Sequence, residues 1–346
     1  MMAAAAKHLA LGEELVPAGE EAAIQAVVTA SEGTVRTAFE GGDRPARRDA
    51  HPKQHGCVRA EFRVEDGLPD DLRHGVFREP RTFPAYIRFS NGSAKLQPDT
   101  KGDARGMAIK LMGVEGEKLL ADQRHALTQD FVFISHPVFF VRNALDYPQL
   151  LKPSGEPRPT FFFPGLNPFS WRLRELFIVL VIQLCKPGSP LGLRYWSMTP
   201  YRLGPGAVKH MVVPHAGNQG TAAVPGSPDY LRIVMAEHLK SQPAGFDFCV
   251  QRQVDPVRMP IEDAVVRWDE QLSPFQKVAT ITIPPQTFDT PEQMTFCENL
   301  SFTPWHCLPE HRPLGGINRT RKEVYEAVSR LRHQLNGVPR EEPSGF

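Results

Sequence analysis

The chain has 346 residues, of which 41% are hydrophobic and 23% charged, a composition typical of a soluble globular protein with a sizeable core. Its formal net charge of +1 excludes the strong basic field with which many proteins recruit nucleic acid. The five cysteines are scattered and form no CxxC pair, which argues against a disulfide scaffold or a zinc site. The first residues lack the basic region and apolar core of a signal peptide, so we expect a cytoplasmic protein.

The first half of the chain predicts one helix followed by short strands. Ala23, Ile24, Val27 and Val28 recur at helical spacing, which predicts a helix within residues 17–39. Short runs of strand composition follow, each bounded by Gly, Pro, Asp or Asn, at residues 57–64, 85–90, 106–112, 130–134 and 137–142. Consecutive strands of this kind are typical of a continuous antiparallel sheet or barrel.

The most apolar run of the chain lies at residues 176–184 and is too short for a transmembrane span of about 20 residues. We interpret it as a buried helix. The alternative is a helix that lies on a membrane surface or lines the access route of an apolar substrate. Further strands are expected at residues 230–235, 246–253 and 277–283. Because no repeat or low-complexity linker divides the sequence, we expect a single domain over residues 1–346.

An amphipathic helix of about four turns is expected at residues 318–337. Thr320 and Glu323 have the spacing of a capping box, which predicts the start of the helix. The pair Asn336-Gly337, followed by Pro339, predicts its end.

One stripe of this helix carries Arg321, Tyr325 and Arg332 along nearly one line. A cation beside a phenol favours the ionised form, and a phenolate is a ligand suited to iron. The helix pattern by itself favours a simpler interpretation, in which a half-buried tyrosine lies beside solvated arginines.

Two other segments contain polar groups that could carry chemistry. His51 and His55 share a loop, but further ligands are absent nearby, so a zinc site is disfavoured and hydrogen-bonded loop histidines are expected. Arg88 and Ser90 share one face of the strand at residues 85–90 by the period of two. If that face points into a small barrel, both side chains need an anionic or polar partner.

Taken together, these motifs resemble the haem catalase superfamily. They occur in the family's order as Arg48-x-x-His51-x-Lys53, IRFS at residues 87–90, DARGMAIK at 103–110, HPVFFVRNALDYP at 136–148 and Arg321-x-x-x-Tyr325. The sequence is more similar still to the short catalase-related haem proteins, through SMTPYRLG at 197–204 and ENLSFTPWHCLPEHRPLGGINR at 298–319. The resemblance covers residues 15–335. It implies an α+β fold, a catalase-like antiparallel β-barrel of about eight strands with surrounding helices, without the C-terminal helical domain of full catalases.

The resemblance also implies a pocket for haem b, iron protoporphyrin IX. Tyr325 would be the proximal metal ligand, and Arg321 would keep its phenolate ionised. His51 would be the distal acid and base, and Ser90 would hydrogen-bond its ring. The remaining assignments are the arginines that clamp the haem propionates, Arg48, Arg88 and Arg332, and the aromatic residues on the distal face, Phe139 and Tyr147.

The distal side departs from the family pattern. Where catalases have an asparagine just before Pro137, this sequence has Ile134-Ser135-His136, and Ser135 or His136 is left as a partial substitute. The distal loop reads HPKQHG in place of the usual HAKG.

The function implied is that of a haem-dependent peroxidase that reduces hydrogen peroxide or organic hydroperoxides with an organic reductant and has weak catalase activity at best. The alternatives are a fatty-acid-hydroperoxide isomerase or dehydratase, as in allene oxide synthases, and a haem-binding sensor without turnover. Expected partners are peroxide, a small organic or lipid substrate and a second copy of the chain in a homodimer. We expect no nucleic acid and no transmembrane segment, and contact with a membrane surface is the alternative for the apolar run at residues 176–184.

Overall fold

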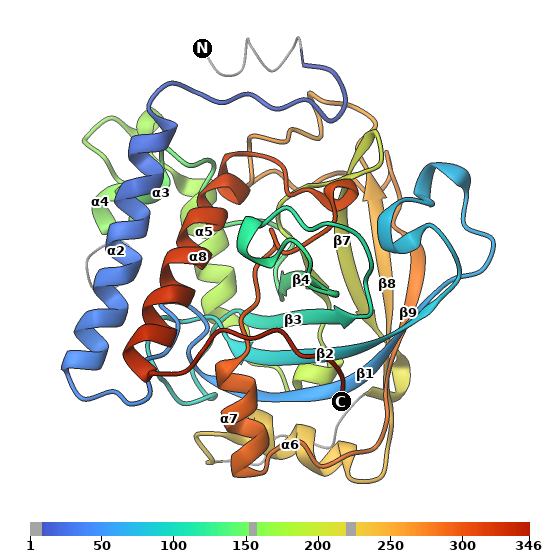
Figure 1. Cartoon of the computed structure of the whole chain (residues 1–346). Helices are drawn as coiled ribbons and strands as arrows, with labels where there is room; N and C mark the ends of the chain where they lie inside the picture. Colours follow the sequence, from blue (N-terminus) through green and yellow to red (C-terminus); the bar gives the residue numbers. More distant parts are fainter. Residues whose placement is uncertain (1–8, 152–157, 219–225) are drawn as a thin grey trace.

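The computed structural model describes residues 9–151, 158–218 and 226–346 (Figure 1). Its centre is a closed antiparallel β-barrel in which eight strands pair in the order β5-β4-β3-β2-β1-β9-β8-β7, and β5 also pairs with β7 to close the ring. The expected eight-stranded barrel is thereby confirmed. The barrel strands are β1 (Gln54–Val64), β2 (Thr82–Asn91), β3 (Arg105–Met112), β4 (Thr128–Ile134), β5 (Tyr195–Trp196), β7 (Gly206–Pro214), β8 (Ala244–Arg252) and β9 (Gln276–Ile283), and β6 (Tyr201–Leu203) pairs with β7 alone.

The barrel interior is filled by side chains. Ala60, Phe62 and Val64 are buried and alternate along β1 with exposed residues, which is the pattern of a strand with one face in a core. Aromatic rings occupy the centre, where the Phe62 and Phe131 centroids lie 5.2 and 5.1 Å from that of Phe248. Such a barrel is a packed core with no room for a cofactor, so any binding site must lie outside it.

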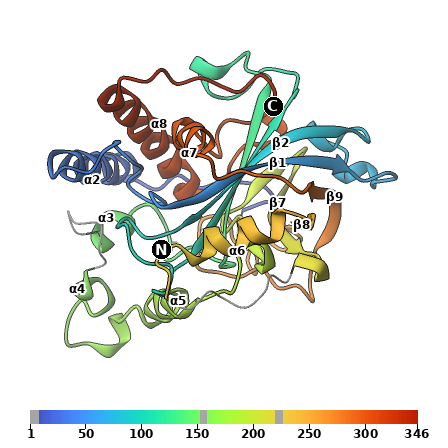
Figure 2. The ribbon, with the colours of Figure 1, turned by 90° about the horizontal axis from the view of Figure 1, so that it is seen from below.

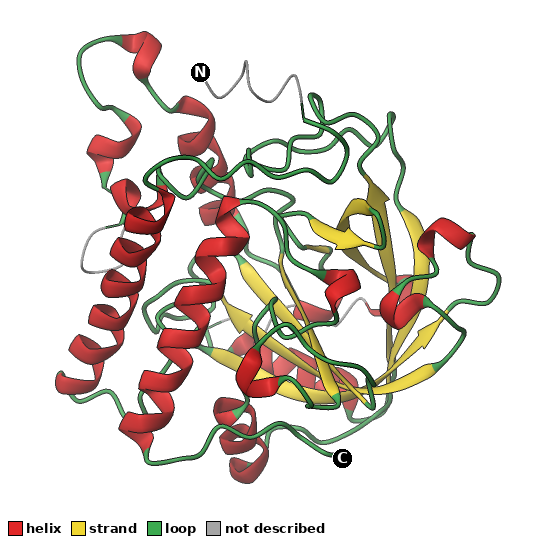
Figure 3. Cartoon of the chain, turned by 45° about the horizontal axis from the view of Figure 1, so that its top comes forward, coloured by secondary structure: helices red, strands yellow, loops and turns green. Residues whose placement is uncertain are grey.

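Helices cover the outside of the barrel. The two longest, α2 and α8, pack side by side through a cluster that includes Val27, Val324 and Val328 (Figures 1 and 3). The α-helices are α2 (Glu20–Glu40), α3 (Tyr147–Leu150), α4 (Pro159–Phe162), α5 (Leu173–Leu184), α6 (Tyr230–Leu239), α7 (Pro291–Asn299) and α8 (Gly316–Asn336). Short 3-10 helices occupy Asp70–Leu72, Gly75–Phe77, Ala121–Gln123, Pro168–Ser170, Pro190–Gly192, Ala216–Asn218 and Pro309–His311. In the parts of the chain that the structure describes, no helix is long and apolar enough to cross a bilayer.

Two predicted strands are wrong. Residues 230–235 belong to helix α6, because Leu231, Val234 and Met235 are buried together at helical spacing. Residues 137–142 form an irregular loop, since β5 takes the place next to β4 that a further strand would need.

The predicted capping box of the last helix is also wrong. Helix α8 begins at Gly316, and Thr320 lies inside it with its hydroxyl donating to the Gly316 carbonyl at 2.9 Å. The predicted end is confirmed, because Gly337 takes the left-handed conformation with φ 64°. A capping box that the sequence reasoning missed starts α7, where Thr290 and Gln293 bond each other's backbone.

The apolar run forms a helix as predicted, but the interpretation that this helix is buried is wrong for its outer side. Only Glu175 and Ile178 of α5 are fully buried, while large apolar residues such as Phe177 and Leu184 are exposed.

Candidate functional site

A cavity of about 760 Å³ lies between the outer wall of the barrel and helices α2, α3, α5 and α8. Arg88 and Ser90 reach it because they point outward from β2, whereas Ile87 and Phe89 enter the barrel core. The pair therefore shares one face as predicted, but the face is the covered outside of the barrel. All predicted site residues except Ser135 line this one cavity: Arg48, His51, Arg88, Ser90, Phe139, Tyr147, Arg321, Tyr325 and Arg332.

The His51 ring is held on the barrel wall. Its Nδ1 lies 3.1 Å from Ser90 Oγ, and its carbonyl accepts a hydrogen bond of 2.9 Å from Arg88. The backbone of His51 has φ 60°, an uncommon conformation that its N–H bond to the Gly92 carbonyl, at 3.3 Å, helps to maintain. Because Nδ1 is held by Ser90, Nε2 is the ring nitrogen left for a ligand.

Gly106 on β3 makes room for this arrangement. A Cβ atom at that position would lie 2.6 Å from both His51 Nδ1 and Ser90 Oγ. Only glycine therefore allows the ring to lie against the strand. The sequence reasoning missed this residue, although the motif DARGMAIK contains it.

His51 is neutral in this environment. Burial lowers its pKa from the ordinary value of 6.5 to about 3, and the positive charges of Arg88, Arg321 and Arg48 act in the same direction. A neutral imidazole with one nitrogen fixed can accept a proton at the other.

The proximal wall is a single helix, α8, on which Arg321 and Tyr325 are one turn apart. Arg321 Nη2 lies 3.3 Å from Tyr325 Oη, and its other nitrogen Nη1 is shared among Asn318, Thr199 and Tyr201 at 3.1, 3.3 and 3.4 Å. Burial opposes the charge of Arg321, but attraction to Tyr325 and Tyr201 outweighs it, so the pKa of Arg321 is raised. The guanidinium is thus a fixed positive charge beside the phenol oxygen.

Two arginines from distant parts of the sequence meet at Glu298, and a third, Arg88, lines the same cavity. The Glu298 Oε1 accepts hydrogen bonds from Arg48 at 2.9 Å and from Arg332 at 3.3 Å. Arg332 also donates to the Leu300 carbonyl at 3.2 Å. One carboxylate against three guanidinium groups leaves an excess of two positive charges among these four side chains. Glu298 was not among the predicted site residues, and its role appears only once α7 and α8 are placed together.

The arginine cluster fits an incoming dianion. The Nε atoms of Arg88 and Arg332 are buried and have no hydrogen-bond partner among the residues that the structure describes. Burial and the charge of Arg48 lower the pKa of Arg88 to about 10 and that of Arg332 to about 9. Buried, incompletely paired guanidinium groups are costly, and two carboxylates would satisfy them. The two propionates of haem match this need in number and charge.

Aromatic rings line another part of the cavity. The Phe139 and Tyr147 rings meet edge to face with centroids 5.5 Å apart, and Phe140 stacks on Phe139 at 4.2 Å. They supply an apolar surface on which a planar ring system can lie.

Ser135 does not belong to this set. Its hydroxyl accepts a hydrogen bond of 2.9 Å from the Arg105 backbone, and His136 Nδ1 lies 2.9 Å from the Val138 carbonyl. From residues 134–136 only Ile134 lines the cavity, which leaves this part of the wall apolar. The structure therefore does not bring Ser135 or His136 to the place of the absent asparagine, because Ser135 bonds the backbone of Arg105 on β3 through both its hydroxyl and its N–H.

Metal-ligating clusters of three or more His, Cys, Asp or Glu side chains are absent from the described parts of the chain. His55 is buried with Nε2 2.9 Å from Asn91 Oδ1, so the expected hydrogen bond is present, but the residue lies in strand β1 and not in a loop.

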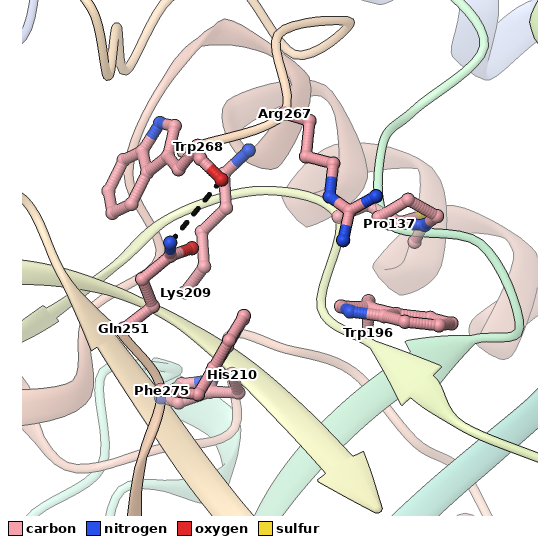
Figure 4. A pocket seen from close by; sticks show the side chains of 9 residues that line it. Pro137, Trp196, Lys209, His210, Gln251, Arg267, Trp268 and Phe275 are labelled. Carbon is pink, nitrogen blue, oxygen red and sulfur yellow. Dashed lines mark hydrogen bonds between the residues drawn. The ribbon is translucent and has the colours of Figure 1, made fainter. Parts of the chain in front are cut away.

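A second, much smaller cavity of about 10 Å³ lies near Trp196 and Lys209 (Figure 4). It has room for about one water molecule. Burial lowers the pKa of Lys209 to about 7, and its ammonium group donates to the Val266 carbonyl at 3.1 Å and lies 5.1 Å from the centre of the Trp268 ring. None of the predicted site residues lines it.

Comparison with known proteins gives one consistent family. A family model described as Catalase matches residues 37–167. The catalase of Schizosaccharomyces pombe is 26% identical over 297 residues, which cover 77% of this chain and 54% of that protein. Catalase T of Saccharomyces cerevisiae is 32% identical over 108 residues, 31% of this chain and 17% of that protein. The chain thus spans about half, or less, of the length of these relatives.

Solved structures agree with the fold. The structure of a fungal catalase matches with a TM-score of 0.66 at 18% identity, covering 87% of this chain and 63% of that chain. Catalase A from Saccharomyces cerevisiae matches with a TM-score of 0.65 at 18% identity, covering 87% and 65%. The family model over residues 37–167 and the related sequences are similar to catalases, and the closed eight-stranded barrel with its outer helices is the fold of the solved catalase structures.

Proposed function

We propose that this chain, as one domain over residues 1–346, is a haem-dependent peroxidase that reduces hydrogen peroxide or organic hydroperoxides with an organic reductant. The observation that carries the proposal is that a neutral His51, an arginine-bonded Tyr325 and an arginine cluster with two unmatched positive charges line one cavity. These are the parts needed to bind a dianionic iron porphyrin and to move a proton beside it.

The chain would hold haem b through three sets of residues. Tyr325 supplies the oxygen ligand for iron, with the Arg321 charge favouring its anionic form. Arg48, Arg88 and Arg332 bind the propionates, and Phe139 and Tyr147 pack against the porphyrin plane. Haem bound there supplies a redox-active iron at which the O–O bond of a peroxide is broken.

His51 carries the proton during this cleavage. With haem in place, neutral Nε2 would accept a proton from a peroxide beside it and return it to the oxygen that leaves as water or alcohol. Ser90 keeps Nδ1 in place throughout, and Arg88 holds the backbone of the same residue.

The apolar Ile134 supports a peroxidase over an efficient catalase. An amide at this point would help hold a second hydrogen peroxide molecule, whereas an isoleucine offers no hydrogen bond. A second candidate function is the isomerisation or dehydration of fatty-acid hydroperoxides. Val179 and Ile182 of α5 favour it, because they give the cavity an apolar flank on which an acyl chain can lie.

The test compares three assays on the haem-loaded protein. We expect reductant oxidation with hydrogen peroxide or an organic hydroperoxide, and only slow oxygen release from hydrogen peroxide. Vigorous oxygen release would overturn the peroxidase proposal. Consumption of a fatty-acid hydroperoxide without any reductant would support the second candidate, and a haem spectrum that peroxide leaves unchanged would indicate a sensor. The homodimer expected from the resemblance stays a prediction.

A further inference from the structure

An extended apolar patch lies on the outside of α5 and the loop before it. Leu166 and Phe169 at the tip of the loop are 100% and 99% exposed. Figure 2 shows α4, α5 and the loop that joins them at the periphery of the molecule, away from the barrel. We name the following exposed residues the apolar patch: Phe163, Leu166, Phe169, Trp171, Leu173, Phe177, Leu180, Val181 and Leu184. Exposed apolar areas of this extent on a protein usually mark a contact surface.

The patch continues along one face of α5. Leu173, Phe177, Leu180 and Leu184 follow one another at spacings of three and four residues, so their side chains share one stripe of the helix. The opposite stripe, with Val179 and Ile182, lines the cavity. Helix α5 is therefore apolar on both sides. Contact with the cavity explains the apolar residues of its inner side but not those of its outer side.

The loop presents its two apolar tips in a fixed conformation. Asn167 lies between them, and its side chain accepts a hydrogen bond of 3.1 Å from the Phe169 N–H. The Trp171 indole donates to the Gly165 carbonyl at 2.9 Å, and Arg172 donates to the Phe161 carbonyl at 2.9 Å. The exposure of Leu166 and Phe169 is thus built into the local structure.

The charge around the patch is positive. Over residues 158–188 the exposed charged side chains are Arg158, Arg174 and Lys186. The acidic residue of this stretch, Glu175, is buried and lies 3.4 Å from Arg142. Asp263, which is 25% exposed and 3.5 Å from Arg142, is a carboxylate near Arg174, but within residues 158–188 the exposed charges are all positive. An apolar surface bordered mainly by cations matches a bilayer with anionic headgroups. A two-fold contact with a second copy would instead place the same cations near one another.

We propose that the apolar patch docks this protein on the surface of an anionic lipid bilayer. Leu166, Phe169 and the outer stripe of α5 enter the boundary between headgroups and acyl chains, and Arg158, Arg174 and Lys186 meet lipid phosphates. The proposal rests on the exposed side chains and their charges, and it holds whatever reaction the cavity performs. Docking in this way places the cavity one helix away from the lipid.

Vesicle co-sedimentation of the full chain tests the proposal without any peroxide. We expect the protein to sediment with phosphatidylcholine vesicles that contain phosphatidylglycerol, more weakly with pure phosphatidylcholine, and less as salt rises. Replacing both Leu166 and Phe169 by Ser should lower the affinity for vesicles by on the order of tenfold or more. The matched control replaces Leu127 and Val257 by Ser, since these are 59% and 51% exposed far from the patch in sequence, and should bind as the unchanged protein does.

A second variant separates charge from apolar contact. Replacing Arg174 and Lys186 by Gln should weaken binding to the anionic vesicles and leave binding to pure phosphatidylcholine unchanged. Light scattering gives the mass of the protein in solution. It tests the alternative that a second copy of the chain covers the apolar patch. If the unchanged protein ignores both vesicle types, or if it is a dimer that the Leu166→Ser/Phe169→Ser change dissociates, the bilayer proposal is overturned. Circular dichroism of each variant checks that the fold is kept.

Discussion

The proximal and distal sides of the cavity are built in different ways. The proximal side is one stripe of helix α8, where Arg321, Tyr325 and Arg332 follow from the helical period alone. The distal side is assembled from the loop before β1 and from strands β2 and β3, which contribute His51, Ser90 and Gly106. The spacing of residues on one helix is set by that helix, whereas the relative positions of residues on an assembled side depend on each contact between elements.

The largest expected effect breaks the proximal side. Replacing Tyr325 by Phe removes the oxygen that we assign to iron, so stable binding of ferric haem should be lost. Titration of the purified protein with haem, followed by absorption, measures this. The matched control is Tyr86→Phe, a buried tyrosine whose hydroxyl bonds the Gly345 carbonyl away from the cavity. An unchanged haem spectrum in Tyr325→Phe would refute the ligand assignment.

The next effect separates the two sides. Replacing His51 by Ala should leave haem binding intact, because the proximal helix is untouched, and should slow the reaction with peroxide by about 100-fold or more. Stopped-flow absorption of the haem-loaded variant gives both quantities. A variant that reacts at the original rate would show that another group moves the proton.

A smaller effect tests the packing of the distal side. In Gly106→Ala the new methyl group would meet His51 Nδ1 and Ser90 Oγ at 2.6 Å, so the ring must shift. We expect a loss of about tenfold in the peroxide step with haem still bound. Gly165→Ala is the control, since a Cβ there meets nothing within 4 Å. Equal rates for both glycine variants would show that the His51 position is not critical.

The hydrogen bond to the ring should matter less. Ser90→Ala removes the hydrogen bond that orients the His51 ring, which is worth about 1 kcal/mol. We therefore expect the rate of the peroxide step to fall by a few-fold. Steady-state kinetics against both peroxide and reductant should place the change in the peroxide step alone. A loss as large as that of His51→Ala would mean that Ser90 itself takes part in the proton transfer.

The smallest expected effect is that of pH. Burial and three arginines keep the pKa of His51 at about 3, so its neutral form persists as pH falls from about 8 to about 5 and is lost only near the pKa. The rate of the peroxide step should therefore be nearly constant over that range. An imidazole with the ordinary pKa of 6.5 would be mostly protonated at about pH 5, and a matching fall in rate would contradict the environment described for His51.

Much of the fold follows from local sequence. Alternation in segments such as 57–64 and 277–283 places strands correctly, since a strand with one face in a core must alternate. Residues 230–235 are misassigned because a short apolar run fits a buried helix as well as a strand, and only packing against the barrel decides. The closure of the ring through β5, a strand of two residues, leaves almost no trace in the sequence.

The site divides in the same manner. The sequence by itself determined the stripe on α8, because residues on a helix keep their relative positions wherever the helix packs. Only the tertiary structure decided that Glu298 joins Arg48 and Arg332, that Ser135 turns away from the cavity and that half of α5 remains exposed. These three outcomes depend on which surfaces meet across the fold, and burial is a property of those pairs of surfaces rather than of any one segment.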